Sequence, residues 1–271
     1  MPFYILHYLS WITGKLASIE HPKFLVQIAI RIFAYFVAAN LNEAEKDITE
    51  YSSVQNFFTR KLKPGVREIE TGLVSPVDGT LRAWGSVADD KFTELKGRQY
   101  SLVDLFSNKE AANRFKEYNF FNLYLSPKDY HHVHSPFNVE IYRIDHIPGS
   151  LWPVNNWAIK NIDGLFFSNE RVVFYLNSSV GEIVLIMIGA TNVGQIKVPF
   201  ADFTSNQAPW SRTNLKTINC NYPIQVKKAE LLGSFLLGSS VLLLVPKSLS
   251  LCPKVNQENN YAIKLGMQIA L

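Results

Sequence analysis

Near residue 73 the sequence changes its pattern. From there onward, short runs rich in β-branched and aromatic residues are separated by turn residues, which is typical of β-strands. Helical patterns do not alternate regularly with these runs, as a parallel sheet would require, although residues 102–118 predict one further helix. We therefore expect a mainly antiparallel β core. The predicted strands lie at residues 80–87, 120–125, 139–147, 171–176, 183–188, 193–198, 224–228 and 239–245.

The segment before this point has helical periodicity. Within residues 23–39 the polar side chains of Lys23, Gln27 and Arg31 recur every four positions, and apolar residues fill most of the remaining helical surface. Residues 1–40 also carry half of the chain's net charge of +4. Such an amphipathic helix fits a membrane interface, with its cations toward lipid headgroups, but a helix packed on the domain core is an equally good interpretation.

A second, shorter helix is expected at residues 54–60, because Ser53 before it is a favourable N-cap. Together these patterns predict an α+β fold. Residues 1–60 would form a helical, membrane-facing segment, and residues 61–271 would form a mainly antiparallel β domain that carries the candidate catalytic residues.

Composition excludes several classes of protein. The 271 residues are 47% hydrophobic and 18% charged, so the chain can bury a substantial core. A net charge of +4 is small for a dedicated nucleic-acid binder, and we expect no nucleic-acid partner. Cys220 and Cys252 cannot build a disulfide framework or a four-cysteine zinc site.

Two features of the apolar segments bear on the membrane. The first lysine is Lys15, so no cationic stretch precedes the N-terminal apolar run, and we expect no secretory signal and a protein that stays inside the cell. No uninterrupted apolar run reaches the length of about 18 residues that a spanning helix needs. Peripheral association is therefore expected rather than integral spanning.

Residues 126–136 contain three of the chain's six histidines, His131, His132 and His134. A metal site would need a further ligand at a workable spacing, and no His-Glu-x-x-His motif or cysteine pair accompanies these residues, so we expect no metal. Proton transfer suits them better, because imidazole titrates near neutrality and can act as base and then as acid. At least one of the three should be structural, and His132 is the candidate.

Residues 231–245 form an apolar segment that contains a candidate nucleophile, Ser239. Its composition also fits a buried β-hairpin with small residues at the turn. A serine nucleophile needs a base and an acid, which His134 and Asp78 could supply. Asp78 lies in the turn sequence of residues 75–80, where Asp-Gly is also an ordinary turn dipeptide. The assignment assumes that the three side chains converge in the folded chain.

Taken together, these segments resemble the phosphatidylserine decarboxylase family, pyruvoyl-dependent enzymes of the bacterial type that make phosphatidylethanolamine. Each match is short, but their order and spacing agree through nearly the whole chain. The matching segments are residues 53–60, 62–65, 75–79, 130–136, 165–166, 169–173, 193–194 and 233–239.

The resemblance implies that the chain cleaves itself between Gly238 and Ser239. Residues 1–238 would become the beta chain and residues 239–271 the alpha chain, with Ser239 converted to a pyruvoyl group. That group would form a Schiff base with the amine of phosphatidylserine and accept the electron pair left by departing carbon dioxide, which protein side chains cannot do. The implied product is phosphatidylethanolamine.

The resemblance also implies roles for the candidate residues. Asp78 would orient His134, and His134 would deprotonate Ser239 for attack on the Gly238 carbonyl, as in a charge relay. His131 would protonate the carbanion that remains after decarboxylation, or position the substrate carboxylate. The implied partners are phosphatidylserine and a second copy of the chain in a homodimer, bound peripherally to the cytoplasmic side of the inner membrane.

Two positions depart from the family pattern. Ser240 stands where threonine is usual, which keeps a hydroxyl, and Ser234 stands where arginine is common, which removes a possible headgroup contact. Three alternatives stay open. They are a serine hydrolase that uses Asp78, His134 and Ser239 on an uncleaved chain, a pyruvoyl decarboxylase of a soluble amino acid, and a non-catalytic membrane-associated relative.

Overall fold

The computed structural model describes residues 2–93, 99–154, 156–191, 195–207, 214–236, 239–252 and 260–271. The helices are α1 (Pro2–Ala17), α2 (Lys23–Val37), the short 3-10 helix η1 (Ile48–Glu50), α3 (Val54–Phe58), α4 (Leu102–Phe106), α5 (Lys109–Arg114), α6 (Asn156–Asn161) and α7 (Leu165–Ser168). The strands before the histidine segment are β1 (Leu73–Val74), β2 (Gly79–Ser86), β3 (Lys91–Thr93), β4 (Gln99–Ser101) and β5 (Tyr118–Leu125). The remaining strands are β6 (His132–His134), β7 (Val139–Ile147), β8 (Arg171–Ser178), β9 (Gly181–Ile188), β10 (Ile196–Val198), β11 (Phe203–Thr204), β12 (Lys216–Thr217), β13 (Ile224–Val226), β14 (Leu231–Phe235), β15 (Ser239–Pro246), β16 (Tyr261–Ile263) and β17 (Gln268–Ala270).

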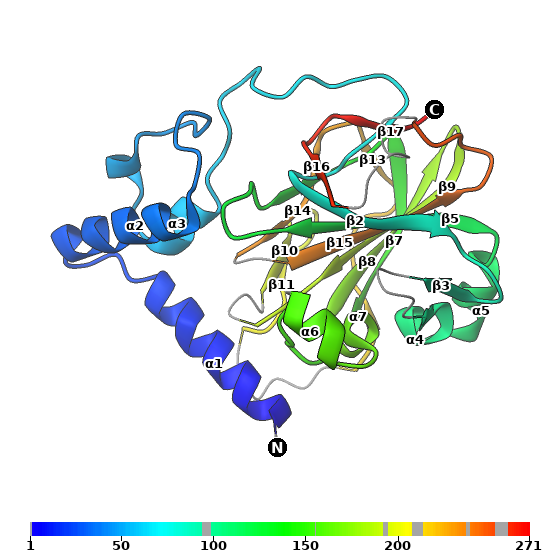
Figure 1. The fold of residues 1–271 in the computed structure, drawn as a ribbon, viewed down its shortest axis with the longest axis horizontal. Coiled ribbons are helices and arrows are strands. Elements are labelled where there is room, and N and C mark those ends of the chain that lie inside the picture. The colour runs from blue at the N-terminus through cyan, green and yellow to red at the C-terminus, as the bar shows by residue number, and fades with distance from the viewer. Residues whose placement is uncertain are drawn as a thin grey trace.

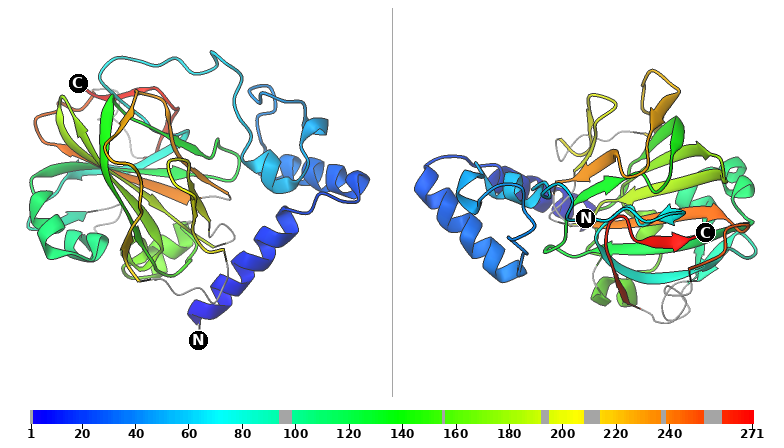
Figure 2. Two further views of the ribbon diagram at one scale, coloured as in Figure 1. Left: turned by 180° about the vertical axis from the view of Figure 1, so that it is seen from behind. Right: turned by 90° about the horizontal axis from the view of Figure 1, so that it is seen from above.

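Helices α1, α2 and α3 project to one side of the β core, as Figures 1 and 2 show. The helix predicted from residue 23 is confirmed as α2, which ends where Ala38 adopts a left-handed conformation with φ of 54°. Val26, Ile30 and Ala34 form its buried stripe, while the rest of its apolar surface is largely exposed. None of the described helices combines the length and apolar character needed to cross a bilayer.

The short helix α3 starts as its sequence predicts. The Ser53 hydroxyl accepts a hydrogen bond from the Asn56 N–H at 3.1 Å, which is an N-cap contact. The helix ends at Phe58, two residues before the predicted end, because Thr59 leaves helical geometry with ψ of 30°. The ring of Phe33 from α2 lies 6.1 Å from that of Phe58, so α2 packs directly on α3.

The predicted antiparallel core is confirmed as a large sheet with the strand order β12-β7-β8-β9-β15-β5-β2-β16, to which β13 adds beside β7. Every strand pairing in it is antiparallel. The long strands lie within two residues of their predicted limits. The strand expected at residues 193–198 starts at Ile196 in the structure, and residues 192–194 lie outside the described part of the chain.

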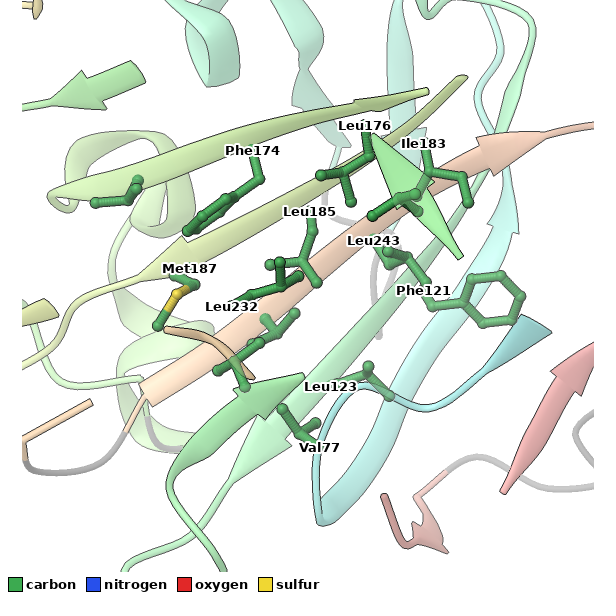
Figure 3. Close-up of a cluster of buried hydrophobic side chains, with 14 of the residues drawn as sticks. Val77, Phe121, Leu123, Phe174, Leu176, Ile183, Leu185, Met187, Leu232 and Leu243 are labelled. Atoms are coloured by element: carbon green, nitrogen blue, oxygen red, sulfur yellow. The ribbon is translucent and has the colours of Figure 1, made fainter. Parts of the chain in front are cut away.

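A second sheet, in the order β11-β10-β14-β6, packs on one face of the large sheet. The side chains between the two sheets form the main core, shown in Figure 3. Alternate residues of each long strand point into this layer, as period-two side-chain geometry requires. Its fully buried members include Phe121, Leu123, Phe174, Leu185, Met187, Leu232 and Leu243.

The opposite face of the large sheet is covered by α4, α5, α6 and α7 (Figure 1). The single helix predicted over residues 102–118 is wrong: two short helices occupy this region, and Tyr118 already begins β5. Ser107 ends α4 in a left-handed conformation with φ of 51°. Asn108 then caps α5 by accepting hydrogen bonds from two backbone N–H groups. Local capping therefore divides the segment.

Backbones come unusually close just after β7. The Ser150 N–H donates to the carbonyl oxygen of Ser168 at 2.6 Å, and Ser150 also bridges to Asn169. A Cβ added to Gly149 would lie 2.5 Å from the carbonyl carbon of Asn169 and 2.5 Å from the Ser168 oxygen. Backbone atoms cannot move aside as a flexible side chain can, so glycine is required here.

We expect Gly149→Ala to lower the free energy of unfolding by about 1–3 kcal/mol, because the added methyl overpacks against backbone. The matched control is Gly14→Ala in α1, where an added Cβ meets no atom within 4 Å. Urea unfolding of both variants and the parent chain checks this. Unchanged stability of Gly149→Ala would contradict it.

Candidate active site

The candidate site lies at one end of the large sheet. Ser239 begins β15 opposite Leu125, the last residue of β5, and Ser240 pairs with Ile188, the last residue of β9. The structure places Ser239 by its backbone, and Gly238 lies outside the described residues. The Ser240 hydroxyl is fully buried and has no hydrogen-bond partner within the described part of the chain.

The histidine segment lies beside the strand that leads to Ser239. In the small sheet β6 pairs with β14, so that His132 is opposite Ser234 and His134 is opposite Leu231. Beyond this ladder the Phe235 N–H donates to the carbonyl oxygen of His131 at 3.0 Å. Backbone pairing thus brings two segments together that are about a hundred residues apart in the sequence.

His134 is a neutral base in this structure. Its Nδ1 lies 2.7 Å from the carbonyl oxygen of Ala229, which can only accept, so Nδ1 carries the proton. The lone pair at Nε2 then accepts from the Tyr130 hydroxyl at 3.0 Å. Burial lowers the pKa of His134 to about 4, although the charge of Asp78 acts in the opposite direction.

Asp78 has other hydrogen-bond partners than His134 in the described part of the chain, and its expected role in orienting His134 stays a prediction. One carboxylate oxygen accepts from Arg67 Nε at 2.9 Å and from the Leu265 N–H at 2.8 Å, and the other meets Arg67 Nη2 and Lys264. Burial raises the pKa of Asp78, but the bonds from Arg67 and Leu265 outweigh it and hold the pKa below 3.8. Asp78 therefore acts on His134 through its charge.

Sequence reasoning assigned no role to Arg67 or Tyr130. Arg67 pairs with both Glu43 and Asp78, which fixes the carboxylate of Asp78. Burial raises the pKa of Tyr130, so its hydroxyl keeps the proton that it donates to His134. Tyr130 directly precedes the histidines and could have been found as a phenol beside a base. Arg67 had no comparable signal, because its partners are set by the tertiary fold.

His131 is fully buried and neutral. Its Nδ1 lies 2.8 Å from the carbonyl oxygen of Asp129 and so carries the proton. Its Nε2 has no hydrogen-bond partner among the described residues. The ring lies 3.9 Å from that of Phe58, and burial lowers the pKa of His131 to about 3. Nε2 of His131 is therefore a buried nitrogen whose lone pair has no hydrogen-bond partner among the described residues.

The contacts of His132 fit the structural role predicted for it. Its Nδ1 lies 2.6 Å from the Ser234 hydroxyl, and its Nε2 lies 2.9 Å from the carbonyl oxygen of Thr59. Both ring nitrogens are therefore occupied, and burial lowers the pKa of the imidazole. Among the described residues, no group of three His, Cys, Asp or Glu side chains is arranged to hold a metal ion.

Two hollows meet at Tyr130. One, of about 490 Å³, is bordered by His132 and His134 and by residues 61–67 of the connector after α3. The other, of about 220 Å³, is bordered by Asp78 and Arg60. The larger volume falls within the range of small-molecule sites. Asp78 and His134 thus border space that a ligand could enter.

Residues 169–173, which carry part of the family resemblance, brace the same end of the sheet. The Asn169 amide donates to the carbonyl oxygens of Trp152 and Gly189 at 2.8 and 2.9 Å. Arg171 is buried and donates to carbonyl oxygens of α4, of Phe167 in α7 and of Asn169. These contacts are structural, because they satisfy backbone groups of the loops around the site.

The chain is similar in sequence to proteins of one known family. The family model for phosphatidylserine decarboxylase matches residues 54–271. A phosphatidylserine decarboxylase proenzyme of Myxococcus xanthus is 33% identical over 267 residues, which is 97% of this chain and 93% of that protein. Proenzymes of the same name from Variovorax paradoxus and Polaromonas sp. are each 37% identical, over 89% and 91% of this chain and 84% and 88% of theirs.

We expect Arg67→Ala to lower the free energy of unfolding at neutral pH by about 3–5 kcal/mol, because it leaves a buried carboxylate without its main partner. The pKa of Asp78 is below its ordinary value of 3.8, so the ion pair stabilises the fold above pH 3.8 and the stabilisation is lost as the pH falls below it. The stability difference from the parent should therefore shrink in acid.

Urea unfolding at neutral pH and at about pH 3 measures this difference. The control is Arg114→Ala, which breaks an exposed pair with Glu182 and should cost less than about 1 kcal/mol. A difference between Arg67→Ala and the parent that is equal at both pH values would contradict the assignment.

Proposed function

This chain belongs to the phosphatidylserine decarboxylase family, and on that premise we propose that it decarboxylates phosphatidylserine to phosphatidylethanolamine. The observation that carries the proposal is the pairing of β6 with β14. It holds two neutral, buried histidines, His131 and His134, beside the strand that leads to Ser239. Those are the groups that self-cleavage and proton transfer need.

We propose that the chain first cleaves itself at Gly238–Ser239. Nε2 of His134 accepts the proton of the Ser239 hydroxyl, which replaces Tyr130 as its hydrogen-bond donor. The oxygen attacks the Gly238 carbonyl carbon, the peptide C–N bond breaks, and an ester forms. Elimination of the Gly238 carboxylate leaves dehydroalanine, which tautomerises and takes up water to give the pyruvoyl group and ammonia. Residues 1–238 and 239–271 are the two product chains.

The pyruvoyl group supplies a ketone that accepts the electron pair left by carbon dioxide. The surrounding residues fit such a group, because Nε2 of His131 is buried and has no partner among the described residues. Since this imidazole is neutral, it first takes a proton from the substrate ammonium and then returns a proton to the carbon that lost carbon dioxide. His131 is therefore the proton carrier of the turnover step.

We propose that the helical segment, residues 1–60, docks on the cytoplasmic face of the inner membrane. Large apolar side chains are exposed on both α1 and α2, which is the expected pattern for a helix lying in the interface. Lys23 and Arg31 are exposed on α2 and available to anionic headgroups. Residues 61–271 form the catalytic domain in this proposal. The processed chains assemble as a homodimer.

The serine-hydrolase alternative uses the same base, His134, and the same nucleophile, Ser239, as self-cleavage, with Arg67 as the partner of Asp78 and Ala229 as the partner of His134 in both cases. The mass of the purified chain, measured in the first experiment below, separates the two. A decarboxylase of a soluble amino acid would leave the exposed apolar helices without a use. The non-catalytic relative is separated by the first experiment below.

We expect denaturing intact mass to show two chains in place of the 30.8 kDa precursor, the smaller comprising residues 239–271 with a blocked N-terminus. Ser239→Ala and His134→Ala should remain uncleaved. His131→Ala should cleave, yet release carbon dioxide from phosphatidylserine about 100-fold more slowly, because it lacks the proton carrier.

An uncleaved His131→Ala chain would contradict this division of roles. An intact parent chain that hydrolyses esters would indicate the hydrolase, and a cleaved parent that releases no carbon dioxide would indicate the non-catalytic relative. The His132→Asn variant serves as a control for loss of a neighbouring structural histidine, and it should keep His131-dependent turnover if it cleaves.

Membrane docking predicts that the double variant Tyr35→Asp/Phe36→Asp binds vesicles at least about tenfold more weakly, because two apolar side chains no longer enter the interface. These side chains are 84% and 80% exposed, so the fold should tolerate the change. Flotation with vesicles containing anionic lipid measures binding. Trp157→Asp on α6 is the control, since this side chain is exposed on another element. Equal binding of the parent, the double variant and Trp157→Asp would contradict the proposed docking.

A further inference from the structure

Phe58, the last residue of α3, and the two residues after it contact the histidine segment, and Phe58 lies against His131. We propose that Phe58 is a positioning residue for His131. Its ring shields the imidazole of His131 from water and fixes the orientation of the imidazole plane. This inference rests on the proposed role of His131 as proton carrier.

The contact itself is close. The ring centroids of Phe58 and His131 are 3.9 Å apart with an angle of 40° between the planes. The exposed fractions are 1% for Phe58 and 0% for His131. Since the Nδ1 edge of the imidazole is fixed by the Asp129 carbonyl at 2.8 Å, the Phe58 ring supplies a second constraint, on the face of the imidazole. One edge and one face together determine its orientation.

The two following residues hold the backbone around His131. Arg60 Nη2 donates to the carbonyl oxygen of Lys128 at 2.6 Å and approaches that of Asp129 at 3.4 Å, the same oxygen that His131 uses. The carbonyl oxygen of Thr59 accepts from Nε2 of His132 at 2.9 Å. Residues 58–60 therefore contact residues 128–132 of the histidine segment, and displacement of Phe58 is opposed by its neighbours.

The groups around His131 show what the Phe58 ring controls. Burial is the main influence and favours the neutral imidazole, and the cationic Arg60 and the neighbouring His132 act in the same direction. The bond to the Asp129 carbonyl and the charge of Asp78 oppose them. Removing the Phe58 ring admits water to one face of the imidazole and so reduces the burial that lowers the pKa of His131. The pKa of His131 should then rise from about 3 toward its ordinary 6.5.

The chain offers a closely matched control in the same helix. Phe57 is also a fully buried phenylalanine, but its ring packs on Phe33 at 6.3 Å and on Tyr51 at 5.3 Å and lies 5.2 Å from the Arg60 guanidinium, instead of packing on the imidazole. Phe57→Ala and Phe58→Ala remove the same atoms from α3. Loss of packing is common to both variants, whereas loss of the shield over His131 is specific to Phe58→Ala.

The experiment measures kcat for phosphatidylserine in detergent micelles against pH, after intact mass has established cleavage. We expect Phe58→Ala to lose about tenfold in kcat between pH 7.5 and 5.5, as a base with a pKa near 6.5 would. The parent and Phe57→Ala should stay level over this range. Identical profiles for both alanine variants would overturn the inference, while a parent without cleavage or decarboxylation would instead overturn the proposed function.

A direct titration keeps the test independent of processing. In the uncleaved Ser239→Ala background, NMR of ring-labelled histidine follows the protonation of His131 with and without Phe58→Ala or the milder Phe58→Leu. We expect the titration to move toward pH 6.5 in the Phe58 variants and to remain far below it with Phe57→Ala. A His131 titration that stays unchanged in both Phe58 variants would overturn the inference.

Discussion

The candidate site depends on the antiparallel pairing of β6 with β14. This ladder holds the histidine segment and the strand before the cleavage site in one sheet, and it does so with backbone hydrogen bonds that do not depend on the side chains. The small sheet is held in turn by burial of its inner face on the large sheet, where Leu232 and Met187 belong to one core. Packing of the two sheets therefore determines which polar residues meet.

Burial also decides the protonation of those residues. The three imidazoles are neutral for a common reason, since the interior disfavours the charged form, and carbonyl oxygens determine which nitrogen of His131 and His134 carries the proton. Asp78 stays charged in the same region because Arg67 and a backbone N–H compensate its burial. Neutral bases and a compensated acid side by side are typical of functional sites.

Much of the fold could be predicted from local patterns. The sequence predicted the N-cap at Ser53, the helix α2 and the β-rich runs of the core. It could do so because capping and side-chain periodicity act over a few residues. The prediction of one helix over residues 102–118 was wrong, and the cause is also local, because Asn108 caps a new helix within this range. The residues Asp78, His131 and His134 were singled out from sequence and their roles stay predictions, whereas the hydrogen-bond partners of Asp78 and His134, which are Arg67 and Ala229, could not be predicted.

The sequence by itself determined the α+β class, the apolar helical segment, the family and the candidate residues, because each of these is expressed in short segments and in their order. The tertiary structure decided the partners. Arg67 forms an ion pair with Asp78, the Tyr130 hydroxyl hydrogen-bonds His134, and the Phe58 ring contacts His131. These contacts depend on the tertiary packing of the chain. The physical reason is that hydrogen-bond partners and burial depend on three-dimensional neighbours, whereas capping and periodicity depend on chain neighbours.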